Sequence, residues 1–379
     1  MNRFFSLTAV VLLPLILVST TEARRRPKEE KSTPIPLSID PAGGTSPQET
    51  ARFLAGMPLN PRSPLASLTQ TAAWQEHSAH FEAAFAKLVR GKFARLHNWQ
   101  NAYLPESKEP VPVAYYMFSG PDFMYVDQFF PNADTYVMCG KESMGPLPDP
   151  LRIPDLPGAL LNLQNAMKSS LTATYFITQD MKVDLQQQQL NGTIPILYVF
   201  LARAGKSIRE VTGISLDHGG NVRANTSSGT RGVRISYVDD SSGRKQTLYY
   251  FTTDISNGGI GADPGFMKFC ERQGVGVSFL KSSSYLMFED GFSRVRDFVL
   301  SHSQMIVQDD SGVPINYFDR DKWSLRFFGT YVGPIELFKQ HYQPKLAELF
   351  RQSNPPEFGI GFGYQYNYHR SNLIVAKRN

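Results

Sequence analysis

Cysteine is scarce in this chain, with only Cys139 and Cys270 among 379 residues. Neither lies in a C-x-x-C motif, so the usual redox dithiol pattern is missing. An oxidising compartment would permit a disulfide between them. Cys139 falls within an apolar stretch and Cys270 within a helical one. We therefore expect two buried free thiols, with a bridge as the alternative.

Long apolar runs are also missing beyond the first residues, and nothing later approaches the ~20 apolar residues of a membrane-spanning helix. The run from Phe4 to Val18 is short and follows Arg3, and small residues occupy positions 21 and 23. This is the pattern of a signal peptide over residues 1–23. The arginines at 24–26 resist translocation, so retention as an uncleaved anchor is the alternative. We expect a periplasmic or secreted protein with no stable membrane span.

A strong charge of one sign is absent. The formal net charge is +5, and the basic residues are scattered beyond the cluster at 24–28. Nothing resembles the basic footprint of a nucleic-acid-binding protein, so nucleic acid is excluded as a partner. No repeat occurs at a solenoid or propeller period.

The chain does have the composition of a globular protein, with 41% hydrophobic and 12% aromatic residues. Residues 24–50 are rich in proline, serine, threonine, glycine and charge, which predicts a disordered linker. Residues 51–379 are long enough for a single mixed α/β domain.

A βαβ unit between residues 110 and 142 organises this domain. Residues 111–118 form an apolar, β-rich run typical of a strand covered on both faces. Gly120 and Pro121 end that strand and begin a short helix, and a second strand covers residues 135–140. Such a unit predicts a mixed sheet with ligands near the strand ends.

Other elements are expected around this unit. An apolar stripe at three- and four-residue steps predicts an N-terminal helical region over residues 65–103. Turn sequences between apolar runs predict an antiparallel β-meander over residues 194–254. Its four strands are expected at 194–203, 207–216, 232–238 and 245–253. Further helices are expected at 158–170, 264–273, 292–303 and 335–351, strands at 171–177, 304–308 and 323–332, and a closing hairpin at 358–376.

Four segments resemble a family of uncharacterised exported bacterial proteins. They read YMFSGPDFMYVDQFFP, TLYYFTTD, QDDSGVPINYF and RFFGTYVGPIELF. The resemblance implies a location in the envelope or outside the cell. It supplies no activity and no catalytic residues.

A first candidate site lies in the turn after the first strand of the βαβ unit, at Ser119, Gly120 and Asp122. Backbone N–H groups at a helix start bind anions, and Glu142 after the next strand could hold a ribose. The glycine fingerprint is incomplete and Asp122 would repel phosphate, so we expect no cofactor. Ser119 could act as a nucleophile, although G-x-S-x-G is absent. The structural alternative is that Asp122 caps its helix and Glu142 forms a surface pair.

A second candidate site is the sequence Asp309-Asp310-Ser311, at the end of a predicted strand. Either carboxylate could act as a general base or bind a hard cation, although no metal site is expected. The structural alternative is a turn, because these residues favour turns. The sequence from Lys281 to Ser284 reverses the S-x-x-K order of serine–lysine enzymes and is set aside.

Parallel sheets gather ligands at the carboxyl ends of their strands. We therefore expect Ser119, Asp122, Asp309 and Asp310 to line one pocket, with Glu142 at its rim. Binding of a small molecule or an envelope component is the leading hypothesis. A periplasmic hydrolase that uses Ser119 or Asp309/Asp310 is the first alternative, and a structural envelope protein is the second.

The export hypothesis makes the first testable prediction. N-terminal sequencing of the protein recovered from the periplasm or medium should give a sequence that starts near Arg24. An intact Met1 terminus in the membrane fraction would contradict it.

Overall fold

The βαβ unit forms as predicted. β1 (Val111–Tyr116) and β2 (Ala133–Gly140) are parallel neighbours, and α4 (Phe123–Phe129) connects them. Both faces of β1 are buried, because its residues pack alternately into two separate apolar clusters. The computed structural model describes residues 45–172, 190–224, 228–365 and 367–379, which all lie in one compact unit.

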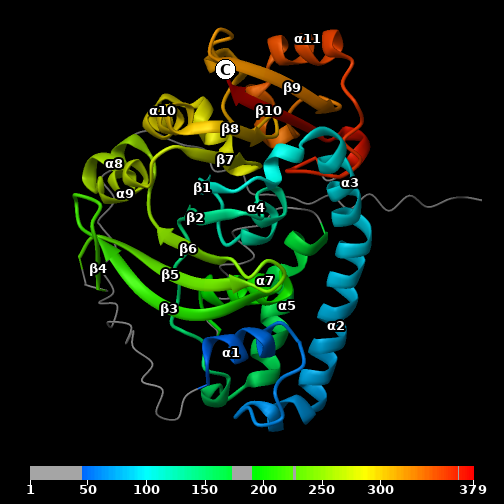
Figure 1. Cartoon of the computed structure of the whole chain (residues 1–379), viewed down its shortest axis with the longest axis vertical. Coiled ribbons are helices and arrows are strands. Elements are labelled where there is room, and N and C mark those ends of the chain that lie inside the picture. The colour runs from blue at the N-terminus through cyan, green and yellow to red at the C-terminus, as the bar shows by residue number, and fades with distance from the viewer. Residues whose placement is uncertain (1–44, 173–189, 225–227, 366) are drawn as a thin grey trace, which may run out of the picture. The chain divides into compact units, whose positions relative to one another are not determined.

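The βαβ unit lies at the centre of a ten-stranded mixed sheet with the order β4-β3-β5-β6-β2-β1-β7-β8-β10-β9, so the fold is mixed α/β (Figure 1). The five central strands, from β6 to β8, are parallel. Antiparallel strands extend the sheet at both edges. The remaining strands are β3 (Lys206–Leu216), β4 (Val222–Ala224), β5 (Thr230–Asp239), β6 (Lys245–Thr252), β7 (Gly276–Leu280), β8 (Ser303–Gln308), β9 (Trp323–Gly329) and β10 (Asn372–Arg378).

The winding of the chain reverses between β1 and β7. From β1 the chain goes to β2 and later to β6 on one side, and it then returns to β7 and β8 on the other. In open sheets of this kind, ligands bind in the crevice outside the carboxyl ends of the strands, at the reversal. The topology therefore places a candidate site after β1 and β7.

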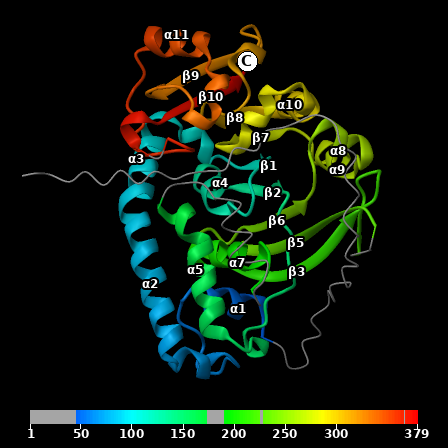
Figure 2. The same ribbon diagram turned by 180° about the vertical axis from the view of Figure 1, so that it is seen from behind.

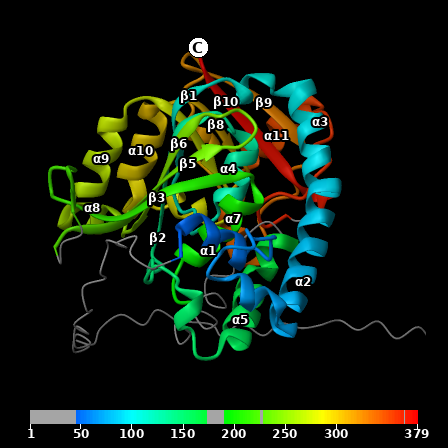
Figure 3. The same ribbon diagram turned by 60° about the horizontal axis from the view of Figure 1, so that its bottom comes forward.

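Helices cover both faces of the sheet. One face packs against α1 (Pro47–Leu54), α2 (Ala72–Leu88), α3 (Ala94–Tyr103), α4, α5 (Leu156–Thr172) and α7 (Ile194–Arg203). The other face packs against α8 (Asn257–Ala262), α9 (Gly265–Gln273), α10 (Ser293–His302) and α11 (Pro344–Ser353). In Figure 3, α9 and α10 lie on one side of the sheet and α2 and α3 on the other.

The predicted N-terminal helical region is present. A π-helical turn at Val89–Phe93 joins α2 to α3, and the two helices form one long column (Figures 1 and 2). α1 crosses the predicted linker boundary at residue 50, with Thr50 and Ala51 buried. Short 3-10 turns complete the fold at Ala66–Gln70, Pro105–Lys108, Pro150–Arg152, Ser283–Phe288, Asp290–Phe292, Ile315–Tyr317, Glu336–His341 and Tyr368–Arg370.

Residues 194–203 are helical, so the predicted first strand of the meander is wrong. The segment IPILYVFLAR places apolar side chains on every side of the helix. α7 is accordingly buried all round, with Ile194 to Ala202 inaccessible to solvent. A short continuous apolar run does not distinguish a buried strand from a buried helix. Pro195 in the first turn fits a helix start. The other predicted strands of the meander are present as β3, β5 and β6.

The structure also differs from the predicted elements at four other places. β7, a central strand, was not predicted, because its five buried residues are too short a run for a periodic signal. The predicted helix at 335–351 is interrupted before Pro344, which begins α11. The described part of residues 358–368 has only an isolated bridge between Phe362 and Gln365, and β10 pairs instead with β8 and β9. The strand expected at 171–177 begins inside α5, and the rest lies outside the described residues.

Both cysteines are free and buried, as the sequence favoured. Burial raises the pKa of the Cys139 thiol to about 12, so it carries no thiolate at neutral pH. No helix in the described part of the chain is long and apolar enough to cross a membrane.

The buried helix α7 makes a stability prediction. Leu197→Ala should lower the free energy of unfolding by about 2–5 kcal/mol, because it leaves a cavity at a fully buried position. Urea unfolding followed by circular dichroism measures this change. Leu161→Ala on α5 is the matched control, since Leu161 is 55% exposed and should have little effect. An equal loss of unfolding free energy in the two variants would contradict the burial of α7.

Candidate functional site

Five buried polar residues meet at the carboxyl ends of β1, β7 and β8. Asp122 comes from the turn after β1, Lys281 and Ser282 follow β7, and Asp309 and Asp310 follow β8. We call these five residues the switch-point cluster. The sheet topology therefore brings together residues that are up to 188 positions apart in the sequence.

Asp122 and Lys281 form an ion pair that joins the two strands at the reversal. Lys281 Nζ contacts Asp122 Oδ2, and both side chains are almost inaccessible to solvent. The Tyr116 hydroxyl also donates to Asp122 Oδ2, at 2.9 Å, and Lys281 Nζ lies 4.3 Å from the centre of the Tyr125 ring. Burial raises the pKa of Asp122 and lowers that of Lys281, while their mutual attraction opposes both shifts.

Asp309 accepts hydrogen bonds on both carboxylate oxygens. Ser311 donates to Oδ1 through its backbone N–H, at 3.0 Å, and through its hydroxyl. The backbone N–H of Ser282 donates to Oδ2, at 3.2 Å. Burial, with a smaller contribution from the neighbouring charge of Asp310, raises the pKa of Asp309 to about 7. Near neutral pH this carboxyl can therefore both accept and release a proton.

Asp310 faces a different set of partners. Tyr285 donates its hydroxyl to Oδ2 at 2.7 Å, and Asn372 on β10 donates to Oδ1 at 2.9 Å. Burial raises the pKa of Asp310 as well. Because successive side chains on extended backbone diverge, Asp309 turns toward Ser282 and Asp310 turns toward Tyr285.

Ser282 has a strained backbone and a hydroxyl without a partner. It lies between β7 and a 3-10 turn, with φ 63° and ψ −97°, where residues other than glycine are rare. Its Oγ is buried and makes no hydrogen bond within the described residues. Strain of this kind at a strand end is typical of active sites, where a reactive side chain must be presented. Phe118, after β1, also has a positive φ of 60°.

Gly363 closes the cluster on one side. A Cβ at this position would lie 1.8 Å from Asp309 Oδ2 and 3.6 Å from Ser282 Oγ, and the residue has φ +60°. The backbone thus passes directly against Asp309 and near the Ser282 hydroxyl. Only glycine allows this close approach.

The residues of the first candidate site divide into two groups. Asp122 belongs to the switch-point cluster. Ser119 instead donates its hydroxyl to the backbone carbonyls of Gly120, at 2.7 Å, and Cys139, at 3.1 Å. Glu142 lies nearby, where Tyr250 donates to its Oε2 at 3.5 Å. No contact among the described residues joins Ser119 to Asp309 or Asp310, so Ser119 and Glu142 lie on the β2 side of the cluster.

The structure also bears on the two structural alternatives, a helix cap at Asp122 and a turn at residues 309–311. Asp122 occupies the N-cap position of α4, the place that the helix-cap alternative gives it, and its strongest contact is with Lys281 rather than with the helix. Its carboxylate is drawn to Lys281, a buried cation that the sequence did not place beside it. Asp309 and Ser311 do form a tight turn, yet the same carboxylate contacts Ser282. Within the described residues no group of three acidic, histidine or cysteine side chains is arranged to hold a metal ion.

Sequence reasoning missed Lys281 and Ser282. The available signal was the KSSS sequence directly after a short apolar run, GVSFL. It was set aside because it fits no serine–lysine motif. Recognising it required β7 as a strand, and the reversal beside β1 then places both residues next to Asp122.

Comparison with known proteins gives no match: no family model matches the chain, and neither does any curated protein. The functional argument therefore depends on the site itself.

The close approach of Gly363 makes a prediction. Gly363→Ala should destabilise the protein by about 1–2 kcal/mol through its positive φ and by a further ~1–3 kcal/mol through the clash with Asp309. Gly243→Ala is the matched control, because Gly243 has φ +71° with nothing within 4 Å of a Cβ. Denaturant unfolding of both variants measures the difference. Equal destabilisation would show that Gly363 does not press on the cluster.

Proposed function

We propose that this protein is a hydrolase of esters or related acyl compounds, with Ser282 as nucleophile and Asp309 as general base. The observation that carries the proposal is the buried Ser282 hydroxyl, which makes no hydrogen bond among the described residues and lies on a strained strand-to-helix turn whose backbone N–H donates to Asp309. Nucleophilic serines of α/β hydrolases occupy turns of this kind, although the G-x-S-x-G sequence is absent here.

The position of the pair supports this function. Ser282 and Asp309 follow two neighbouring parallel strands next to the reversal of the sheet, where ligands of doubly wound proteins bind. Lys281 forms an ion pair with Asp122, while Asp309 accepts hydrogen bonds from Ser282 and Ser311. A base with a pKa of about 7 is well matched to proton transfer at neutral pH.

The reaction would proceed in two steps. Ser282 Oγ bonds to the acyl carbon while its proton passes to Asp309. The bond to the leaving group then breaks, and Asp309 returns the proton to the departing oxygen. In the second step water attacks the acyl-Ser282 ester and gives a proton to Asp309, and Ser282 recovers that proton as the acid leaves.

Substrate entry requires movement of the chain at Gly363, because this backbone lies against both reacting groups. The segment has glycine at 359, 361 and 363, which eases such movement. The substrate would be a small molecule or an envelope component. Export, and hence action outside the cytoplasm, is part of this proposal and rests on the N-terminal sequence alone.

Active-site labelling tests the proposal. A small alkyl fluorophosphonate should add one phosphonyl group to the protein, detected by intact mass and mapped to Ser282 by peptide sequencing. Ser282→Ala should abolish the label. Ser119→Ala is the matched control and should label as the unchanged protein does, because the Ser119 hydroxyl is bound to two backbone carbonyls.

The pH dependence of this labelling tests the base. Asp309 accepts a proton only when ionised, so the labelling rate should rise as the pH passes through about 7 and level off above it. Asp309→Asn should remove both the rise and most of the rate. Labelling of Ser119 would reject Ser282 as the nucleophile and favour a hydrolase that uses Ser119. No labelling across the pH range would reject the hydrolase and leave ligand binding without turnover.

A further inference from the structure

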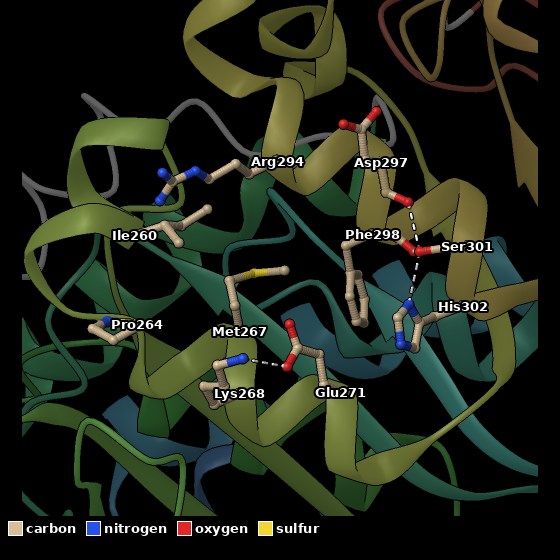
Figure 4. Close-up of a pocket in the computed structure, with 10 residues that line it drawn as sticks. All are labelled: Ile260, Pro264, Met267, Lys268, Glu271, Arg294, Asp297, Phe298, Ser301 and His302. Carbon is tan, nitrogen blue, oxygen red and sulfur yellow. Dashed lines mark hydrogen bonds and ion pairs between the residues drawn. The ribbon is translucent and has the colours of Figure 1, made fainter.

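A groove lies within the layer of α8, α9 and α10 and shares no residue with the switch-point cluster. It lies between α9 and α10 and has a volume of about 500 Å³. Sites for small molecules commonly measure about 300–1,000 Å³. Figure 4 shows that its lining side chains come from α8, α9 and α10.

The floor of the groove is apolar. Ile260, Met267 and Phe298 form it, and each is less than a tenth exposed. The His302 ring stacks on Phe298 with ring centres 4.4 Å apart, and its Nδ1 is 2.9 Å from Ser301 Oγ. The floor therefore suits an apolar body, and the groove ends in a polar group at His302.

Four charged side chains lie at the rim of the groove. Two of them pair with each other, and a third points away from the floor. Lys268 and Glu271 form an ion pair at 3.0 Å on α9. The carboxylate of Asp297 points away from Met267 and Phe298 (Figure 4). Arg294 is different: its guanidinium has no hydrogen bond or ion pair within the described residues, and it lies beside Ile260.

We infer that this groove binds an amphipathic monoanion: a carboxylate on a medium-length apolar body. The Arg294 guanidinium would bind the carboxylate in a bidentate manner. Arg294 and His302 are eight residues apart on α10, a rise of about 12 Å, which matches a chain of roughly eight to ten carbons laid over Phe298. Glu271, which also lines the groove, would repel a second anionic group, so a monoanion is favoured over a dianion.

Calorimetric titration of the mature protein with decanoate, below its micelle concentration, tests this inference. We expect saturable binding of one decanoate. Decanol and decyltrimethylammonium share the apolar chain but lack the anion, so they should bind at least about tenfold more weakly. Arg294→Gln should weaken decanoate binding by a similar factor and leave the decanol affinity unchanged.

Arg320→Gln is the matched control, because Arg320 is exposed and does not line the groove. It should leave decanoate binding unchanged. A second variant, Met267→Glu, places a negative charge on the floor and should weaken decanoate more than decanol. Equal binding of decanoate and decanol, an unchanged affinity in Arg294→Gln, or uptake that does not saturate would overturn the inference. The outcome is independent of Ser282 labelling.

Discussion

The buried contact between Asp122 and Lys281 is the interaction on which the centre of this protein depends. It joins the βαβ unit to the strand on the other side of the reversal. Removing one partner of a buried ion pair leaves an uncompensated charge and typically costs about 3–5 kcal/mol. The pair therefore ties the two halves of the doubly wound sheet together at the point where its polar groups are concentrated.

The same burial sets the chemistry of the neighbouring carboxylates. Lys281 forms its ion pair with Asp122, and burial raises the pKa of both Asp309 and Asp310. Hydrogen bonds from Ser311, Ser282, Tyr285 and Asn372 compensate only in part. The site thus combines a fixed ion pair with two carboxyls that hold protons readily. Ser282, with its strained backbone, adds a buried hydroxyl that makes no hydrogen bond within the described part of the chain.

Local sequence patterns predicted the elements whose periodicity is distinct. β1 follows from a continuous apolar, β-rich run that ends at Gly120 and Pro121. The stripe of α2 and α3 and the antiparallel strands β3, β5 and β6 follow from a recognisable period or turn. α7 was predicted as a strand because a short apolar run does not distinguish a buried strand from a buried helix, and β7 was not predicted because its run has only five residues. Because β7 was not predicted, Lys281 and Ser282, which follow it directly, were not predicted as site residues.

The sequence by itself determined that Asp122, Asp309 and Asp310 lie at strand ends, since turn residues follow apolar runs at both places. Only the tertiary structure decided which of them meet. The reversal between β1 and β7 brings Lys281 to Asp122 and Ser282 to Asp309, whereas Ser119 turns back to the carbonyl of Cys139. The physical reason is that strand order is set by long-range packing of both faces of the sheet, and this packing leaves no mark in the local sequence.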